Sequence, residues 1–506
     1  MVKTGKVYIL GVGPGDYKLM TLKAAECIEK ADVIVYDRLV NSKILRFAKQ
    51  NAEFIYVGKK PDHHAVPQDG INEILVQKAM EGKTVARVKG GDPFMFGRGG
   101  EEAEVLVEKG IEFEIIPGVT SAISVPAYAG IPVTHRDYCS SLHIITGHEK
   151  PGKETSFIDY EALAKVEGTL VFLMGVKNLT EISSNLIKYG KDSSTPAAVI
   201  EKGTTSSQRT VTGTLESIAG VVSEAGIRSP AVTVIGGVVN LKEKLHWFPK
   251  GKLAGKSVLV TRSRDQASRL VQVIEDMGGE AIEFPTIKIA EPLDYSLFDK
   301  ALFSLGTFNW LVFTSVNGVT SFFQRMKTKK IDIRNLWGVK ICAVGEATAA
   351  ELEKHGLASD FMPGNYTTSD LLDGLLKRIK PGEKVLLARA DIGSEELSEG
   401  LRENNVDFED LAVYRTLIES PHKEEVIKLL EENSLNFVTF TSSSTVRNFV
   451  SIIGKENLNK LINTKVVCIG PVTEQTAKEL GLNVSAVADI YTIDGLINKL
   501  LEITEG

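Results

Sequence analysis

Short runs of apolar, often β-branched residues alternate with amphipathic stretches along the whole chain. In the first part, strands are predicted for KVYILG, ADVIVYD, EFIYVG, TVARVKGG and FEIIPG, which begin at residues 6, 31, 53, 84 and 113. Segments such as 22–31 and 70–83 lie between these runs and carry apolar residues at helical spacing. Further strands are predicted near residues 142, 169, 195 and 231. This rhythm is typical of α/β domains with largely parallel sheets.

Breaks in the rhythm predict the domain organisation. A chain of 506 residues is too long for one hydrophobic core. Pro117–Gly118 ends the first series of strands, so we expect two subdomains at about 1–117 and 118–245. The Lys-, Gly- and Pro-containing segment 246–256 is the predicted linker, and the strand KSVLVTR opens a second domain at 257–506.

The second domain contains an internal repeat. The pattern of 311–323 followed by 340–357 returns in 437–450 followed by 465–482. In each copy a strand and a Thr-Ser pair precede a second strand that ends in glycine and a helix that carries threonine. We therefore expect two similar lobes, at about 257–287 with 417–506 and at about 290–414. Ligands of open α/β sheets bind at the carboxyl ends of the strands, so hydroxyls there predict a ligand site between the lobes.

Composition narrows the class of protein. The net charge of −6 gives no general attraction to nucleic acid, and no apolar run is long enough to span a membrane. The four cysteines are far apart and form no C-x-x-C, which argues against a metal site and fits the reducing cytoplasm. An acidic substrate would have to be held by local Arg and Lys side chains.

Two glycine-rich loops follow predicted strands. The first, Gly11 to Asp16, allows close backbone approach to a ligand, but its spacing and Pro14 disfavour a dinucleotide fingerprint. The second, KGGDPFMFGRGGEE from Lys89, sets Asp92 and two aromatics among glycines. Asp92 is predicted either to accept hydrogen bonds from a ligand or to cap the turn.

Here the sequence resembles a known family. The strings GVGPGD, YDRLV, KGGDPFMFGRGGEE, PGVTSAISVPAYAGIPVTHR, TGH, FLMG and EKGT occur in the order seen in uroporphyrinogen-III C-methyltransferases and cover most of the first 240 residues. The resemblance implies the tetrapyrrole methyltransferase fold, two α/β subdomains with a cleft. It also implies S-adenosyl-L-methionine as methyl donor and no metal. The implied cofactor-binding residues are Pro14, Gly90, Gly91, Asp92, Met95, Thr120, Ser121, Met174, Gly203 and, by a weaker match, Ala198 and Ala231.

The same resemblance implies catalytic and substrate-binding roles. Asp37 matches the family's proton acceptor and Lys59 its proton donor, although a helix cap and a solvated charge are the plainer interpretations. Arg98 and Arg136 would pair with the substrate's carboxylates, or else form surface ion pairs. Homodimerisation through this half is also implied.

The second half shows no nucleophile elbow, metal spacing or carboxylate pair. The ordered strings VLVTR, FPTIKI, VFTSVNGV, AVGEATA, VYRT, FTSSSTV and IGPVT resemble uroporphyrinogen-III synthases, which implies a bilobed fold with mostly parallel sheets and hydroxymethylbilane as substrate. Tyr414 would assist departure of the hydroxyl, or else anchor the hinge. Hydroxyls that would bind the substrate, or else cap helices, are Ser315, Thr348, Ser443 and Thr473.

Together the two halves predict a cytoplasmic bifunctional enzyme. It would cyclise hydroxymethylbilane to uroporphyrinogen III with inversion of ring D, and then methylate C2 and C7 to give precorrin-2. One alternative is that the second half is a non-catalytic regulatory module that binds a small ligand. Another is that the first half is a nicotinamide-dependent enzyme.

Overall fold

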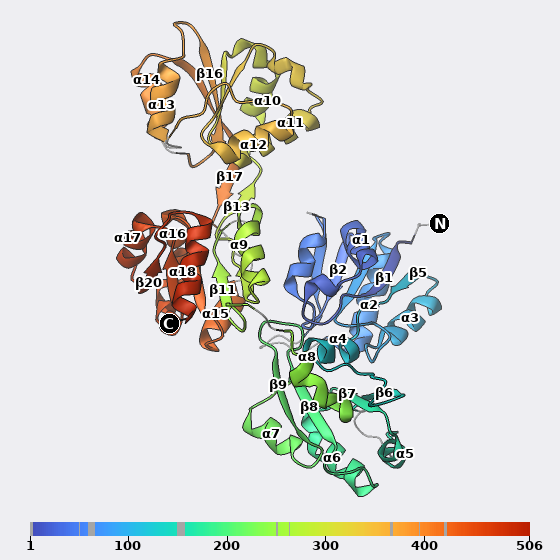
Figure 1. Cartoon of the computed structure of the whole chain (residues 1–506). Helices are drawn as coiled ribbons and strands as arrows, with labels where there is room; N and C mark the ends of the chain where they lie inside the picture. The colour runs from blue at the N-terminus through green and yellow to red at the C-terminus, as the bar shows by residue number, and fades with distance from the viewer. Residues whose placement is uncertain are drawn as a thin grey trace. The chain divides into compact units, whose positions relative to one another are not determined.

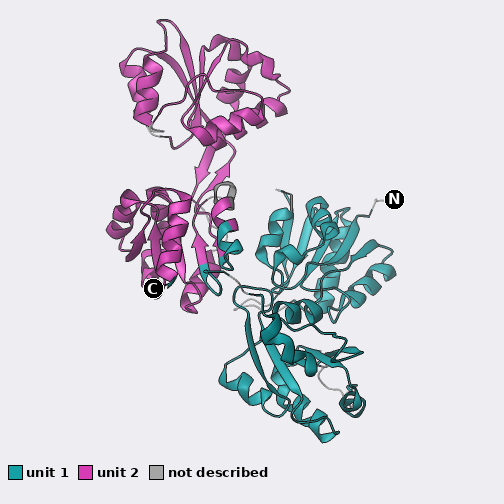
Figure 2. Cartoon of the chain, in the orientation of Figure 1, with its two compact units in different colours: residues 1–257, 273–280, 505 teal, residues 258–272, 281–504, 506 magenta. Residues whose placement is uncertain are grey.

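The computed structural model describes residues 4–49, 51–58, 66–148, 157–248, 251–262, 264–364, 368–393, 395–418 and 423–505, without the side chains of 264–268. The chain packs into two compact units (Figure 2). The first consists of residues 1–257 with 273–280 and 505, and the second of 258–272 with 281–504. Each unit holds two five-stranded sheets. No helix in the part of the chain that the structure describes is long and apolar enough to cross a membrane.

The first sheet is wholly parallel and has the order β3-β2-β4-β1-β5. Its strands β1, β2 and β5 are labelled in Figure 1. Its strands are β1 (Lys6–Gly11), β2 (Val33–Tyr36), β3 (Glu53–Tyr56), β4 (Val85–Lys89) and β5 (Glu112–Ile116), and its helices are α1 (Leu22–Lys30), α2 (Gln68–Met80) and α3 (Gly99–Glu108). Alternate residues of a strand face opposite sides. Val7, Ile9 and Val85 therefore pack with residues of α2 and α3, whereas Leu10 and Val88 pack with residues of α1.

The second sheet is mixed and has the order β6-β7-β10-β8-β9. Only β6 and β7 form a parallel pair, so the expectation of largely parallel sheets fails here. One antiparallel pair, β8–β9, is a hairpin, which needs no crossover helix. The other two arise because β10, after a longer connection, inserts antiparallel between β7 and β8. The strands are β6 (Leu142–Thr146), β7 (Thr169–Leu173), β8 (Pro196–Glu201), β9 (Arg209–Thr214) and β10 (Ala231–Ile235), and the helices are α4 (Ser121–Tyr128), α5 (Tyr160–Lys165), α6 (Leu179–Lys188), α7 (Ile218–Glu224) and α8 (Lys242–Leu245).

One sheet of the second unit has the order β12-β11-β18-β19-β20, and the pairs from β11 to β20 are parallel. Its core is rich in Phe and Leu, with Phe284, Phe440 and Phe449 in edge-to-face contact. The elements of this lobe are β11 (Ser257–Val260), α9 (Arg264–Asp276), β12 (Glu280–Glu283), α15 (Lys423–Glu431), β18 (Phe437–Phe440), α16 (Ser443–Ile453), β19 (Lys465–Cys468), α17 (Pro471–Glu479), β20 (Val484–Val487) and α18 (Ile493–Glu505).

The other sheet has the order β13-β17-β16-β14-β15, parallel except for the β13–β17 pair. Leu311 and Phe313 pack on one face with α10 and α11, whereas Trp310 and Val312 pack on the other with α13 and α14. The elements are β13 (Lys288–Ala290), α10 (Ser296–Phe303), β14 (Trp310–Phe313), α11 (Val316–Thr328), β15 (Lys340–Ala343), α12 (Glu346–Lys354), α13 (Thr368–Leu376), β16 (Lys384–Ala390), α14 (Glu395–Glu403) and β17 (Asp407–Leu417).

The predicted linker begins as part of the first unit. Trp247 donates from Nε1 to the Ala127 carbonyl oxygen at 2.9 Å, and its ring packs edge-on against Tyr128 at 4.9 Å between centroids. The boundaries expected at 117, 245 and 256, and those of the two lobes, stay predictions.

Candidate functional site

The loops that follow β1, β4 and β5 meet at glycines on one edge of the first sheet, the edge formed by the carboxyl ends of its strands. Gly13 and Gly91 exchange backbone hydrogen bonds of 3.2 and 2.8 Å. A Cβ atom placed on Gly118 would lie 2.3 Å from the Gly91 carbonyl oxygen. Both Gly13 and Gly91 have positive φ, of 77° and 70°, which side chains disfavour. The edge is therefore lined by backbone, as predicted from the two glycine-rich loops.

Asp92 holds two of these loops together. Its Oδ1 accepts hydrogen bonds from the N–H groups of Phe94 and Met95, at 2.8 and 3.0 Å. Its Oδ2 accepts from the N–H of Gly118, at 3.0 Å. The turn-capping interpretation of Asp92 is thus present in the structure. Since each carboxylate oxygen accepts up to two hydrogen bonds, Oδ2 retains capacity for a ligand.

A loop of the second sheet joins the same edge. The buried hydroxyl of Thr204, just after β8, donates to the Pro14 carbonyl oxygen and accepts from the Asp16 N–H at 3.0 Å. Tyr128 of α4 donates its hydroxyl to Oδ2 of Asp16 at 3.0 Å. The loop after β1 is therefore fixed by both subdomains. Sequence reasoning did not single out Thr204 or Tyr128.

The structure distributes the predicted cofactor residues over both sheets. Six lie in the loops at the edge of the first sheet, namely Pro14, Gly90, Gly91, Asp92, Met95 and Thr120, and Ser121 follows as the first residue of α4. Met174 follows β7, has positive φ and is half exposed. Gly203 follows β8, and Ala231 begins the antiparallel neighbour β10, where it pairs with Glu201. Ala198 lies inside β8 with a fully buried side chain in the core.

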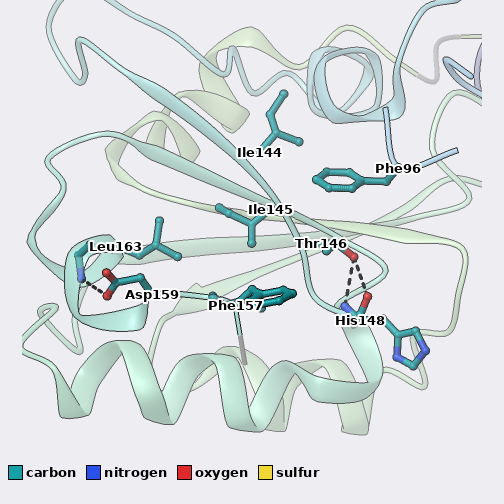
Figure 3. A pocket seen from close by; sticks show the side chains of 10 residues that line it. Phe96, Ile144, Ile145, Thr146, His148, Phe157, Asp159 and Leu163 are labelled. Atoms are coloured by element: carbon teal, nitrogen blue, oxygen red, sulfur yellow. Dashed lines mark hydrogen bonds between the residues drawn. The ribbon is translucent and has the colours of Figure 1, made fainter. Parts of the chain in front are cut away.

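A predominantly apolar pocket of about 510 Å³ lies beside the second glycine-rich loop (Figure 3). Phe96 from that loop lies on the side of β6 to which Ile144 points, Ile145 points to the other side with Phe157 and Leu163, and Thr146 and His148 lie at one end. The Thr146 hydroxyl donates to the His148 carbonyl oxygen at 2.9 Å, which fixes the turn. None of the residues predicted to bind the cofactor lines this pocket.

The two predicted substrate arginines are exposed at loops. Arg98 has φ of 60° and directs its guanidinium to Glu101, with nitrogen–oxygen distances of 2.9 and 2.7 Å. Arg136 is exposed in the loop that precedes β6. A surface ion pair of this kind is weak, so the Arg98 side chain remains available to a polyanionic ligand.

Asp37 follows β2 at the same edge of the first sheet. Its Oδ1 accepts from the Leu39 N–H at 3.0 Å, and its Oδ2 accepts from Arg87 of β4 at 3.3 Å. Lys59, the other residue predicted to be catalytic, lies outside the described residues. Arg87 is part of a buried cluster with Lys89 and Glu102 that sequence reasoning missed.

In the second unit, Tyr414 within β17 and Ser315, two residues after β14, come together. Their hydroxyl oxygens are 3.0 Å apart, and Ser315 also caps α11 by accepting from the Gly318 N–H. Burial raises the pKa of Tyr414, against the opposing effect of its hydrogen bond with Ser315. Tyr414 therefore keeps its proton at neutral pH and can donate a hydrogen bond.

The predicted repeat is present in the fold. Ser315 caps α11 and Ser442 caps α16, and each cap follows the sheet strand by two residues. Thr348 and Thr473 are buried in the first turns of α12 and α17. As a helix cap, the counterpart of Ser315 is Ser442, and substrate binding by Ser443 stays a prediction. Ser443 instead donates to the Val472 carbonyl oxygen at 3.2 Å.

The described residues contain no group of three or more His, Cys, Asp or Glu side chains that could hold a metal ion. Their four cysteines are unpaired, and three of them are buried.

Two family models match the chain. Residues 6–219 match tetrapyrrole (corrin/porphyrin) methylases, and residues 268–498 match the uroporphyrinogen-III synthase HemD. The porphyrin biosynthesis protein HemD of Ruminiclostridium josui is 42% identical over 503 residues, 99% of both chains. A uroporphyrinogen-III C-methyltransferase of Bacillus subtilis is 46% identical over 357 residues, 70% of this chain and 73% of that protein.

Among solved structures, the uroporphyrin-III C-methyl transferase of Thermus thermophilus with S-adenyl homocysteine covers 47% of this chain and 100% of its own. It is 38% identical, with a TM-score of 0.41. With its two matched domains and a relative that spans its full length, the chain belongs to the family of porphyrin biosynthesis proteins that join a tetrapyrrole methylase to a uroporphyrinogen-III synthase.

Proposed function

We propose that this chain catalyses two consecutive steps of tetrapyrrole biosynthesis. The synthase half closes hydroxymethylbilane to uroporphyrinogen III, and the methylase half methylates C2 and C7 to give precorrin-2. The observation that carries the proposal is the 42% identity to one porphyrin biosynthesis protein across both halves, 99% of each chain.

Ring closure requires loss of a hydroxyl as water, inversion of ring D and formation of the last bond between pyrroles. Tyr414 is the group proposed to donate a hydrogen bond to the departing hydroxyl, since its phenol is protonated at neutral pH and Ser315 orients it. Ser315, Thr348, Ser443 and Thr473 are proposed to bind substrate carboxylates at helix N-termini, which favour anions.

S-adenosyl-L-methionine, when bound, supplies an electrophilic methyl group to a pyrrole carbon. The residues fit such a ligand, because the backbone-lined edge has no side chain at Gly90 and Gly91 and carries a carboxylate, Asp92, fixed by three N–H groups. We propose that Asp37 accepts the proton that the methylated ring gives up. Lys59 is the proposed proton donor.

The eight substrate carboxylates need cations at the mouth of the site. Arg98 and Arg136 are exposed and are proposed to bind them, Arg98 by exchanging Glu101 for a carboxylate in the same bidentate geometry. The pocket beside Phe96 is proposed to receive an apolar face of the macrocycle. A homodimer through the methylase half and a cytoplasmic location are further proposals.

The test is an anaerobic incubation of the full chain with hydroxymethylbilane, with and without S-adenosyl-L-methionine, followed by isomer and mass analysis. Isomer III without the cofactor and a product heavier by two methyl groups with it are expected. Only isomer I, with methylation of supplied uroporphyrinogen III intact, would contradict the synthase and leave a methyltransferase with a regulatory binding module.

A further inference from the structure

The central strand of the first sheet, β4, carries two charged residues on a face that is otherwise part of the hydrophobic core. All five residues of β4 are buried, and Arg87 and Lys89 share the face on which Val85 packs among apolar side chains. In the sheet Arg87 pairs with Ile9 on one side and Val35 on the other. Buried charges at such positions are costly unless they are paired and hydrogen-bonded.

Glu102, in the first turn of α3, supplies the pairing. Its side chain is fully buried, and one oxygen, Oε1, accepts from Arg87 Nε at 3.1 Å, Lys89 Nζ at 2.9 Å and Gln68 Nε2 at 3.2 Å. The other oxygen, Oε2, has no hydrogen-bond partner among the described residues. The three interactions come from β4 and α2, so Glu102 fixes the sheet against two helices.

The guanidinium of Arg87 is held at three points. Besides Glu102, it donates from Nη1 to the Val88 carbonyl oxygen at 3.0 Å and from Nη2 to Asp37 Oδ2 at 3.3 Å. Asp37 is about a quarter exposed and has its other oxygen fixed by the Leu39 N–H. Arg87 therefore links a wholly buried carboxylate to one that reaches the ligand edge.

Within the described part of the chain, Arg87 is the only ion-pair partner of Asp37. Burial lowers the pKa of Lys89, and the neighbouring cation Arg87 lowers it further. The Lys89 ammonium donates a hydrogen bond to Glu102. Among the described residues, the other titratable groups that act electrostatically around Asp37 or its partners are Arg38, Tyr56, Lys89 and Glu102.

We infer that Arg87 and Glu102 are positioning residues for methyl transfer, because the line Glu102–Arg87–Asp37 fixes the carboxylate that accepts the proton. The inference rests on the proposed function of the first half and on the proposed role of Asp37. Neither residue needs to touch the cofactor or the substrate. Their effect on the reaction passes through the orientation of Asp37, and misplacement of a reacting group by about 1 Å can cost about a hundredfold in rate.

The test compares Arg87→Gln with wild type in the full chain, with uroporphyrinogen III supplied as substrate. We expect kcat for methylation to fall about 10- to 100-fold. We expect KM for uroporphyrinogen III and Kd for S-adenosylhomocysteine to stay within about twofold, because the residue lies behind the site. Arg87→Lys, which keeps the charge without the planar fork, is expected to recover part of kcat and also serves if Arg87→Gln fails to fold.

The decisive measurement is a double-mutant cycle with Asp37→Asn. If Arg87 acts through Asp37, adding Arg87→Gln to Asp37→Asn causes no further loss of kcat. Losses that multiply in the double variant, or an unchanged kcat in folded Arg87→Gln, would overturn the inference. Glu102→Gln keeps the shape of the side chain and is expected to give a smaller loss with the same dependence on Asp37.

Lys49→Gln is the matched control. It breaks the 2.5 Å ion pair with Asp32 that precedes β2, at the opposite edge of the same sheet, and should leave kcat unchanged. Two further outcomes distinguish a failure of this inference from a failure of the proposed role of Asp37 or of the proposed function. Full methylation by Asp37→Asn would remove the role of Asp37, and no methylation by wild type would remove the proposed function.

Discussion

Asp92 and Gly118 tie two loops of the first sheet together, through a 3.0 Å hydrogen bond from the Gly118 N–H to Oδ2 of Asp92. The other carboxylate oxygen is occupied by the N–H groups of Phe94 and Met95. The aspartate is thus part of the scaffold that presents the backbone to a ligand, whatever direct contact it also makes.

Asp92→Ala should weaken binding of S-adenosylhomocysteine by about tenfold or more, since hydrogen bonds to a charged group contribute about 1.5–3 kcal/mol each. The affinity is measured by titration calorimetry on the full chain. Asp92→Asn is the sharper variant. The amide oxygen can still accept a hydrogen bond from a backbone N–H group, but the amide nitrogen replaces the second acceptor with a donor. We expect it to lose affinity too, and unchanged affinity in both variants would show that the loops hold without this carboxylate.

Gly203 makes a close approach that no other residue fits. A Cβ there would lie 2.3 and 2.5 Å from the two methyl carbons of Val125 in α4. Gly203→Ala should therefore displace the loop that carries Thr204, destabilise the protein by about 1–3 kcal/mol and reduce methylation.

The matched control for Gly203 is Gly220, inside α7, where a Cβ would meet no atom within 4 Å. Gly220→Ala should stabilise the protein by about 0.5–1 kcal/mol and leave methylation unchanged. Chemical denaturation of both variants tests the pair. Equal stability changes in the two variants would contradict the steric argument.

The strand rhythm predicted the first sheet well because each strand there carries apolar residues at most of its positions, with a few charged residues such as Arg87 and Lys89 between them. The run at residue 6 is β1, with the bounds predicted. The strand β9, RTVTGT, was not predicted. It is half exposed, and four of its six residues are Thr or Gly, a composition that is also typical of loops. Pairing with β8 makes it a strand, and pairing is not visible in one segment's composition.

The positions of the site loops were predictable, but the contacts that fix them were not. Glycines and Asp92 follow strands in the sequence, and strand ends mark ligand edges. Glu102, by contrast, stands in a Glu-Glu pair that looks like a solvated helix start, and only the packing of α2 and α3 against β4 buries it. The same limit applies to Ser442, because three consecutive serines do not reveal which one caps the helix.

Tyr414→Phe should slow formation of uroporphyrinogen III by about tenfold or more and raise the fraction of isomer I. The variant removes the hydroxyl that lies 3.0 Å from Ser315, while Ser315 still caps α11. Isomer analysis after incubation with hydroxymethylbilane measures the change. If the tyrosine only anchors the chain between the lobes, the variant will instead keep its rate and lose about 1 kcal/mol of stability.

The buried thiol of Cys342 should make the second unit less stable in alkali. Cys342 lies in β15 with no exposed surface and packs in the same core as Trp310. Burial raises its pKa from 9.0 to about 12. Above about pH 9 the unfolded thiol ionises while the folded thiol stays protonated. The stabilisation is therefore complete below pH 9 and is lost as the pH rises towards 12.

Linkage gives the size of the effect. A group that is protonated only in the folded state lowers the free energy of unfolding by about 1.4 kcal/mol for each pH unit. Urea unfolding followed by tryptophan fluorescence at pH 7, 9 and 10 measures the slope, because two of the three tryptophans, Trp310 and Trp337, belong to the second unit. Cys342→Ala should flatten the slope between pH 9 and 10 by about that amount, at some cost in stability at pH 7 from the lost sulfur.

The control is Cys27→Ala, which removes a buried thiol from the first unit. It should leave the slope of the second unit's transition unchanged, because Cys27 contributes nothing to the core around Trp310. Other groups also titrate above pH 9, and only the difference between each variant and wild type isolates one thiol. A slope that is identical in Cys342→Ala and wild type would mean that the thiol ionises as readily in the folded unit as in the unfolded chain.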